Sequence, residues 1–367
     1  MANTGWIYAG TGTNGTPSGG VYDWATPTNI VSNNGVEAVY VTPGGSAQGT
    51  SKSLRAKSFG FSIPAGSTID GIESRHESKT VDIVGTLNEY KETTYQLIKT
   101  SSYVGSNRRG NQFLGANAVY TRGSSSDLWG TTWSYSQINS SNFGVGFRVT
   151  SSGLVAFIHM AQAETDYIQI RVYYTEPLAD PSSVVATVVD HNSVTVTWND
   201  NSTGETGFRV QRSVNDGTWT TINTTAAGAE SYTDNTASEG TKNEYRIRAE
   251  GTNPSNNVES GDAHTPPQIP TACAIDTVES NQIEVSWNDN SSVENNYEIS
   301  RSVDGGGFSV LSASLAANTE AYVDSTVLPD TDYQYRVRAL DTNANSGYST
   351  SGTEHTPISF IPSMVIM

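Results

Sequence analysis

A single cysteine, Cys273, occurs among the 367 residues. An internal disulfide needs two thiols and a cysteine-based metal site needs several, so this chain can form neither. In an internal repeat of 89 residues, the counterpart of Cys273 is Val184, which belongs to an expected strand. We therefore expect Cys273 to be a small buried hydrophobic residue rather than a nucleophile.

Long apolar runs are also missing. No stretch reaches the roughly 18 apolar residues that a membrane-spanning helix needs. The first ten residues lack the basic start and apolar core of a secretory signal, so we expect synthesis in the cytoplasm and no membrane insertion. Sustained helical periodicity of apolar residues is absent as well, and the sequence predicts an all-β protein with very little helix.

Charged residues make up only 16% of the chain, yet its net charge is −17. Residues 1–176 contain 12 basic and 12 acidic residues, which leaves 8 basic and 25 acidic residues in the remainder. A nucleic-acid-binding protein needs a basic patch that displaces counterions, so this balance argues against a nucleic-acid partner. The acidic part is either a stalk whose modules repel one another or a segment whose charge only confers solubility.

An internal repeat organises the C-terminal half of the chain. The stretch Trp198-Asn199-Asp200-Asn201-Ser202 returns as Trp287-Asn288-Asp289-Asn290-Ser291, 89 positions later. Further along, Tyr245-Arg246-Ile247-Arg248-Ala249 is matched by Tyr335-Arg336-Val337-Arg338-Ala339. Such a repeat marks consecutive structural modules. We predict an N-terminal domain, two modules and a tail, at residues 1–176, 177–266, 267–357 and 358–367.

Alternating apolar residues predict strands in the N-terminal domain. Every second residue is apolar in residues 59–63, 143–149 and 168–174. This period places one face of a strand on a core and the other face in water. Further strands are expected at residues 81–84 and 154–158. Together these segments predict an antiparallel, jelly-roll-like β-sandwich.

Each repeat shows the pattern of a small sandwich with about seven short strands. A tryptophan ends the second strand (Trp198, Trp287), and a tyrosine lies in the penultimate strand (Tyr245, Tyr335). Both repeats resemble fibronectin type III modules over their whole length. The resemblance implies an immunoglobulin-like sandwich in which the tryptophan lies between the sheets and the tyrosine hydroxyl ties a loop to the backbone.

Two turns of the repeats bear on function. The first repeat has Ser238-Glu239-Gly240 where the second has Leu328-Pro329-Asp330, and we expect this difference to weaken one turn. The Asn-Asp-Asn-Ser cluster after each tryptophan is typical of a turn that hydrogen-bonds its own backbone. It lacks the alternating carboxylates of a calcium loop, so no metal site is predicted there.

A second resemblance concerns the N-terminal domain. Its segments are Trp24-Ala25-Thr26-Pro27-Thr28-Asn29, Phe59-Gly60-Phe61-Ser62-Ile63-Pro64, Ile69-Asp70-Gly71-Ile72 and Ile138-Asn139-Ser140-Ser141-Asn142-Phe143-Gly144-Val145. This set resembles a β-sandwich domain of bacteriophage virion proteins and related prophage proteins, over most of residues 20–175. The resemblance rests on structural turns and core strands, and it implies a virion component without indicating a ligand.

Aromatic and basic residues are concentrated in residues 101–135. Loops on a rigid sandwich often carry binding residues, and aromatic rings beside Asn, Asp and Arg suit a sugar face or a protein hot spot. Alternatively, the rings cap the ends of the sandwich or pack against a neighbouring subunit. The candidate contacts are Tyr103, Arg108, Arg109, Tyr120, Trp129, Trp133 and Tyr135.

The last ten residues are strongly apolar but too short to span a bilayer. Such a segment aggregates unless it is covered. We expect it to dock on a partner subunit, for instance as an added edge strand, or else to fray or fold back on the last module. The candidate docking residues are Phe360, Ile361, Met364, Val365 and Ile366.

The sequence contains no convincing catalytic pattern. Residues 10–15 match G-x-G-x-x-G, but the residues that follow cannot start the helix of a dinucleotide site. Glu73, Arg75 and Glu77 share one face of an expected strand, which indicates an exposed ion-pair ladder. Three histidines, His76, His159 and His191, have no Ser, Cys or Asp partner at motif spacing. We therefore predict no catalytic residue, no metal and no cofactor.

The sequence thus predicts a non-enzymatic structural protein on the surface of a bacteriophage virion, as a capsid decoration or head fibre, or as a tail or neck fibre. The expected partners are capsid, neck or tail proteins, further copies of the chain (a trimer is favoured) and host-surface glycans. The alternative is an accessory carbohydrate-binding protein of a bacterial polysaccharide-degrading system.

Overall fold

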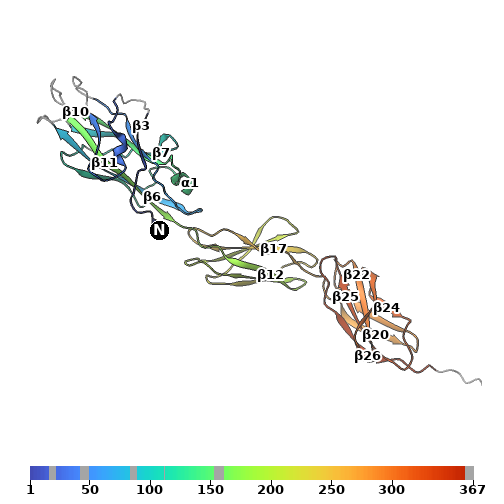
Figure 1. Cartoon of the computed structure of the whole chain (residues 1–367). Helices are drawn as coiled ribbons and strands as arrows, with labels where there is room; N and C mark the ends of the chain where they lie inside the picture. The colour runs from blue at the N-terminus through green and yellow to red at the C-terminus, as the bar shows by residue number, and fades with distance from the viewer. Residues whose placement is uncertain (16–21, 42–48, 83–88, 111, 153–160, 360–367) are drawn as a thin grey trace, which may run out of the picture. The chain divides into compact units, whose positions relative to one another are not determined.

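The computed structural model describes residues 1–15, 22–41, 49–82, 89–110, 112–152 and 161–359 (Figure 1). The chain divides into two compact units, Met1–Pro177 and Leu178–Met367. Within the described residues, helical structure is confined to the 3-10 turn η1 (Pro27–Ile30) and the single turn of α1 (Tyr135–Ile138). The predicted all-β fold class is confirmed. None of the described helical segments is long and apolar enough to cross a membrane.

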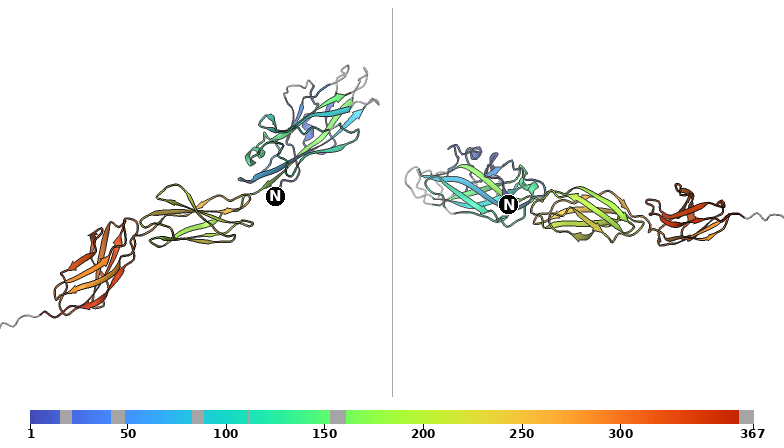
Figure 2. Two further views of the ribbon diagram at one scale, coloured as in Figure 1. Left: turned by 180° about the vertical axis from the view of Figure 1, so that it is seen from behind. Right: turned by 90° about the horizontal axis from the view of Figure 1, so that it is seen from below.

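Two antiparallel sheets face each other in the first unit (Figures 1 and 2). The first sheet has the order β1-β11-β6-β9, and β2 and β4 also pair with β11. The second sheet has the order β3-β5-β10-β7-β8. The bounds are β1 Ala2–Asn3, β2 Ile7–Tyr8, β3 Thr11–Gly15, β4 Ala38–Val41, β5 Ser53–Lys57, β6 Thr68–Asp82, β7 Glu89–Lys99, β8 Ser102–Val104, β9 Ala118–Ser124, β10 Gly144–Ser152 and β11 Ala161–Thr175.

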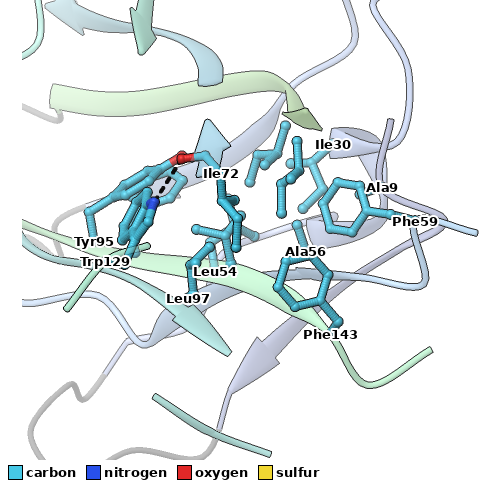
Figure 3. Packing of buried hydrophobic residues seen from close by; sticks show 14 of the residues in the cluster. Ala9, Ile30, Leu54, Ala56, Phe59, Ile72, Tyr95, Leu97, Trp129 and Phe143 are labelled. Carbon is cyan, nitrogen blue, oxygen red and sulfur yellow. Dashed lines mark hydrogen bonds between the residues drawn. The ribbon is translucent and has the colours of Figure 1, made fainter. Parts of the chain in front are cut away.

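One core fills the space between these sheets. Ile72 of β6 and Val172 of β11 contribute from the first sheet, and Leu54 of β5 and Phe147 of β10 from the second. All four side chains are fully buried, as alternation along each strand predicts. Figure 3 shows the packing around Leu54, together with the buried ring of Trp129.

The predicted strand at residues 59–63 is not part of either sheet. Phe59, Phe61 and Ile63 are buried in the core, so the apolar alternation was interpreted correctly as an inward-facing pattern. Among the described residues the segment has no strand partner, and the side chain of Asn139 bonds to the backbone at its end. Asn139 accepts a hydrogen bond from the Ile63 N–H and donates one to the Ile63 carbonyl, both at 2.9 Å.

Most of the glycine-rich run at residues 10–15, from Thr11 to Gly15, forms strand β3, which pairs with β5. A side chain at Gly12 would meet the Pro27 carbonyl oxygen at 1.9 Å, so this position needs glycine for close packing against η1. The predicted strand at residues 81–84 is the end of β6, which is described only to Asp82. The predicted strand at residues 154–158 lies outside the described residues.

The second unit contains two separate cores, one for each repeat. In the first repeat the sheets have the orders β12-β13-β16 and β15-β14-β17-β18, with β19 paired to β17; in the second they are β20-β21-β24 and β23-β22-β25-β26. Their bounds are β12 Ser182–Asp190, β13 Ser193–Asn199, β14 Gly207–Val214, β15 Thr220–Thr224, β16 Ser231–Asp234, β17 Lys242–Glu250, β18 Val258–Glu259, β19 Ala263–His264, β20 Thr271–Val278, β21 Ile283–Asn288, β22 Asn296–Val303, β23 Ser309–Ala316, β24 Ala321–Asp324, β25 Asp332–Leu340 and β26 Ser349–His355.

The repeated tryptophans lie in these cores, as predicted. Trp198 packs against Phe208, and Trp287 packs in the same way against Tyr297, with centroid distances of 5.5 and 5.7 Å. Cys273 is also buried, and burial raises the pKa of its thiol to about 11. This confirms its role as a small hydrophobic residue.

The repeated tyrosines do not bind the backbone as the resemblance implied. The Tyr245 hydroxyl donates to Asp234, and the Tyr335 hydroxyl donates to Asp324 at 2.8 Å. The expected loop tie is made instead by the hydroxyl of Tyr333, which accepts a hydrogen bond from the Leu328 N–H. The first repeat has no such tie because Asn243 stands at the position of Tyr333.

Glu239 connects the two repeats inside the second unit. Its carboxylate accepts hydrogen bonds from the backbone N–H of Gln268 and from the hydroxyl of Ser291, at 2.9 and 3.0 Å. It also accepts from the N–H and hydroxyl of Ser292, at 3.1 and 2.9 Å. The adjacent Gly240 has φ +64°, and a Cβ there would lie 2.7 Å from Val293. The turn that seemed weakened is therefore a contact site for the next repeat.

Glu239→Ala should loosen this joint without unfolding either repeat. Burial raises the pKa of Glu239, but the hydrogen bonds from Gln268, Ser292 and Ser291 outweigh it, and the pKa lies below its usual range. Without the carboxylate, four donors lose their acceptor and bond to water instead. We expect the residual dipolar couplings of the two repeats to fit one alignment tensor in the parent chain and to need two tensors in the variant.

The matched control is Glu259→Ala, which removes an exposed carboxylate from the same repeat. It should leave the single tensor unchanged. A single tensor retained in Glu239→Ala would show that the carboxylate does not hold the joint.

Candidate ligand pocket

The rings of Trp129 and Trp133 are not accessible to a ligand, so their prediction as ligand contacts was wrong. Trp129 is fully buried, and its indole N–H donates to the Ile72 carbonyl at 2.9 Å (Figure 3). Trp133 is only 9% exposed, packs edge-on against Phe143 and donates to the Leu128 carbonyl at 3.1 Å. Both rings cap the sandwich, which is the alternative that the sequence left open.

The other candidate contacts are dispersed. Arg108 pairs with Asp127 at 2.7 Å, whereas the side chain of Arg109 is exposed. Tyr120 is half-buried and stacks on His76 with a centroid distance of 5.2 Å. Tyr135 begins α1 and packs against the edge of the core. Among the described residues, no contact joins these four side chains to one another, so they do not form a single surface patch.

Tyr103 lies across the outer face of the second sheet. Its hydroxyl bonds to Ser53 of β5, and a Cβ at Gly146 would lie 2.8 Å from the same hydroxyl. The Arg55 guanidinium lies over the ring, 5.4 Å from its centroid. Burial raises the pKa of Tyr103, while Ser53, Arg55 and Arg148 act in the opposite direction. Tyr103 is therefore a covering residue with basic neighbours.

Two other segments of the first unit line a pocket of about 240 Å³. Its lining comes from the end of β7 and from the α1 region: Lys99, Thr100, Ser136, Gln137 and Ser140. Thr100 has φ +63°, which turns the chain sharply between β7 and β8. The lining falls just outside residues 101–135, which stand out in the sequence for their aromatic rings, whereas the pocket presents hydroxyl, amide and ammonium groups.

The α1 turn is fixed by a capping box. The Ser134 hydroxyl accepts from the Gln137 N–H, and the Gln137 side-chain oxygen accepts from the Ser134 N–H. This arrangement satisfies two backbone groups at the start of the helix. It uses the amide oxygen of Gln137, whereas its NH₂ group donates to no acceptor among the described residues and lies at the pocket wall.

Lys99 contributes the charge of the pocket. Its ammonium lies 5.7 Å from the ring centroid of Trp133. The ammonium of Lys57 donates to the carbonyl of Thr100 at 3.1 Å, and so lies directly beside the lining. Burial, followed by the neighbouring Arg55, lowers the pKa of Lys57. The pocket therefore presents hydroxyl groups, an amide and cationic groups to one small volume.

A buried polar network lies deeper in the same unit, and sequence reasoning missed it. His76 bonds to Ser78 at 2.7 Å and to Glu92 at 2.8 Å, while Arg122 bonds to the other oxygen of Glu92 at 2.9 Å. The Ser–His–Glu order is that of a hydrolase triad. Ser78, however, is 2% exposed and also bonds to Thr165, so no substrate can reach its hydroxyl in this structure.

The expected ladder of Glu73, Arg75 and Glu77 is also different in detail. These side chains share the outer face of β6, as predicted, but they bond across to neighbouring segments. Glu73 accepts from Arg171, and Arg75 donates to Gln169 at 2.7 Å. The guanidinium groups of Arg75 and Arg171 lie 4.2 and 4.6 Å from the ring centroid of Trp6. This outer face is covered by the N-terminal segment.

The outer faces of the two repeats differ more than their cores do. Arg209 stands opposite Arg248 in the first repeat, and both guanidinium groups reach Glu250. Burial and the nearby Arg248 lower the pKa of Arg209. At the same register in the second repeat, Glu298 stands opposite Arg338 and pairs with it at 2.7 Å. The strand register is thus kept while the charges on the outer side of the sheet change, and Glu298 is buried there.

The second repeat matches a family model described as a PBP1-like, fibronectin3-like domain over residues 277–350. Among solved structures, a two-domain fibronectin type III segment of chicken tenascin is 16% identical, with a TM-score of 0.39, covering 48% of this chain and 100% of that chain. The FN1–FN3 domains of chicken CNTN1 are 15% identical, with a TM-score of 0.26, covering 50% and 68%. No curated protein matches this chain.

The model match and the repeated architecture agree. Residues 277–350 span the strands from the end of β20 into β26, and the first repeat has the same strand order in both of its sheets. The C-terminal unit of this chain is therefore built from fibronectin type III-like modules.

Proposed function

We propose that this chain is a non-enzymatic structural protein of a bacteriophage virion, a capsid decoration or head fibre, or a tail or neck fibre component. In this proposal the N-terminal sandwich attaches to the particle or oligomerises, with a trimer favoured. The fibronectin type III-like modules then make weak, repeated contacts with host-surface glycans. Many copies on one particle turn such contacts into avidity.

The observation that carries this proposal is the contrast between the two modules. Each keeps the same buried tie, in which an aspartate accepts from an arginine and a tyrosine (Asp234 and Asp324). The outer sides of their larger sheets have diverged: Arg209 of the first module corresponds to Glu298 of the second, which is buried and bonded to Arg338 and Tyr348. A module kept only as a spacer has no need of a distinct surface. Divergent faces on a constant framework support two separate contact surfaces.

The alternative is an accessory carbohydrate-binding protein of a bacterial polysaccharide-degrading system. The hydroxyl-lined pocket at Ser136 and Ser140 supports it, since such groups suit a sugar. Both functions involve glycan contacts. They differ in whether the N-terminal unit attaches to a phage particle.

Assembly separates the two. We expect the full chain to sediment as a trimer in analytical ultracentrifugation, and an antibody against it to label intact phage particles produced by the host strain. A monomer that is absent from particles but binds a defined glycan would favour the accessory protein. A chain that is monomeric, absent from particles and without glycan affinity would contradict both functions.

A further inference from the structure

The pocket beside α1 combines two kinds of chemistry that recognise different parts of one ligand. Ser136, Gln137 and Ser140 supply small hydrogen-bonding groups from one wall. Lys99 supplies an ammonium group from the other wall. A volume of about 240 Å³ accommodates one sugar ring rather than a drug-sized molecule. None of the five lining residues carries a carboxylate, so nothing in the described lining repels an anion.

The charge around this pocket is positive and unbalanced. Among the described residues, no carboxylate forms an ion pair with Arg55, Lys57 or Lys99, although the N-terminal 176 residues as a whole are neutral. The ammonium of Lys57 and the guanidinium of Arg55 both donate to backbone carbonyls of the turn after β7, at Thr100 and Ser101. Two cations therefore converge on the segment that forms the pocket rim.

Such an arrangement costs free energy unless an anion is bound. Like charges on neighbouring positions of a sheet repel one another, and partial burial strengthens that repulsion. The opposite sheet shows the usual solution, because Lys79 there pairs with both Glu37 and Glu164 at 3.1 Å. No comparable pair is found for the described cations around the pocket. Cations held together without a carboxylate are typical of sites for oxyanions.

We propose that this pocket binds a sugar residue that carries an oxyanion. Lys99 and Lys57 hold the oxyanion, while Ser136, Gln137 and Ser140 bond to the ring hydroxyls. The oxyanion is a carboxylate, as in a hexuronic acid, or a phosphate, as in a polyol phosphate polymer. The inference names the class of glycan and therefore rests on the glycan contact of the proposed function, but it does not depend on mounting on a particle.

The test uses the full chain and three soluble probes: an oligogalacturonate, a polyglycerol phosphate and neutral maltohexaose. Binding is followed by NMR shifts of backbone amides and by titration calorimetry. We expect one of the anionic probes to shift the amides of Lys99, Thr100 and Ser136, and to bind at least tenfold more tightly than maltohexaose. Raising the salt concentration should weaken that binding, because the contact is ionic.

Variants locate the site. Lys99→Met keeps a long apolar stem over Trp133 but removes the charge, and we expect at least a tenfold loss of affinity for the anionic probe. Lys91→Met is the matched control, an exposed lysine on the same strand β7 but outside the pocket lining, and its affinity should equal that of the parent. Ser140→Ala gives a second, smaller loss without altering charge.

Two results would overturn the inference. One is tight binding of maltohexaose at these amides, which would make the pocket a neutral-sugar site. The other is the absence of shifts at Lys99 and Ser136 with every probe while the chain still labels phage particles. That second result would leave the proposed function standing and remove only the ligand assigned to this pocket.

Discussion

Replacing Glu92 with alanine will lower the free energy of unfolding of the N-terminal unit by about 3–5 kcal/mol, the range for removing one partner of a buried ion pair. The Glu92 side chain is completely buried and holds His76, Arg122 and the Gly110 N–H. Burial raises the pKa of Glu92, but the hydrogen bond from His76 and the charge of Arg122 outweigh it, and the pKa lies below its usual range. Without the carboxylate, the His76 ring loses its buried partner, the Gly110 N–H loses its acceptor, and Arg122 keeps only its bonds to the carbonyls of Arg108 and Thr121.

Hydrogen exchange measured on the full chain reports this change, because peptides from β6 and β7 exchange through opening of the N-terminal unit. Glu77→Ala is the control, since Glu77 lies on the outer face of the strand that carries His76 and bonds only to Asn117 among the described side chains. We expect its effect to stay within about 0.5 kcal/mol. A loss below 1 kcal/mol in Glu92→Ala would mean that the network does not stabilise the sandwich.

Asp324→Asn should unfold the second module at denaturant concentrations that leave the first module folded. Asp324 is 1% exposed and accepts hydrogen bonds from Arg301 at 2.7 Å, from Tyr335 at 2.8 Å and from the N–H of Thr326 at 2.9 Å. An amide at this position turns one acceptor into a donor that faces a guanidinium group. We expect a loss of about 3–5 kcal/mol for this module.

The same carboxylate sets an acid limit. Burial raises the pKa of Asp324, but the hydrogen bonds from Thr326, Tyr335 and Arg301 outweigh it and hold the pKa below its usual range. A depressed folded-state pKa contributes stability above the unfolded pKa, about 3.9, and that stability is lost as the pH falls through the folded value. The parent module should therefore lose stability as the pH falls from the unfolded pKa, about 3.9, through the folded pKa of Asp324. Asp324→Asn should remove much of this loss, because the amide does not titrate.

The first module provides the internal comparison. Asp234 makes the same bonds to Arg212, Tyr245 and Thr236, so Asp234→Asn should destabilise that module and spare the second. Asp276→Asn, on an exposed position of β20, is a neutral control. Equal stability of parent and Asp324→Asn in hydrogen exchange of β22 and β25 would exclude the carboxylate as a stabilising centre.

The framework of the modules was predictable because it depends on local patterns. The tryptophan marks the end of the second strand. The apolar alternation through Tyr335 indicates both the penultimate strand and the face of it that lies in the core. The buried cluster at His76 was not predictable for the opposite reason. Ser74, His76 and Ser78 alternate with Glu73, Arg75 and Glu77, so both faces of β6 are polar and the pattern does not show which one is inside.

The candidate site was only partly predictable. The sequence does not distinguish aromatic residues that cap a core from those that bind a ligand when both lie in a glycine-rich loop. Trp129 is buried because its loop folds back on β6. The lining of the pocket brings Lys99 next to Ser136 and Ser140 through tertiary packing, and no spacing in the sequence indicates that contact. The candidate docking residues Phe360, Ile361, Met364, Val365 and Ile366 lie outside the described residues, and their docking stays a prediction.

The carboxylate of Glu239 gives the tandem a fixed order. Of the two copies, only the first carries this glutamate with the small Gly240 beside it, and the serines that it binds belong to the second copy. The second copy has Pro329 and Asp330 at those positions, and its Leu328 side chain is 65% exposed. Exchanging the order of the two copies would thus leave their joint without this contact and free to rotate. Lengthening the array by duplicating the second copy would place a flexible joint at every new boundary.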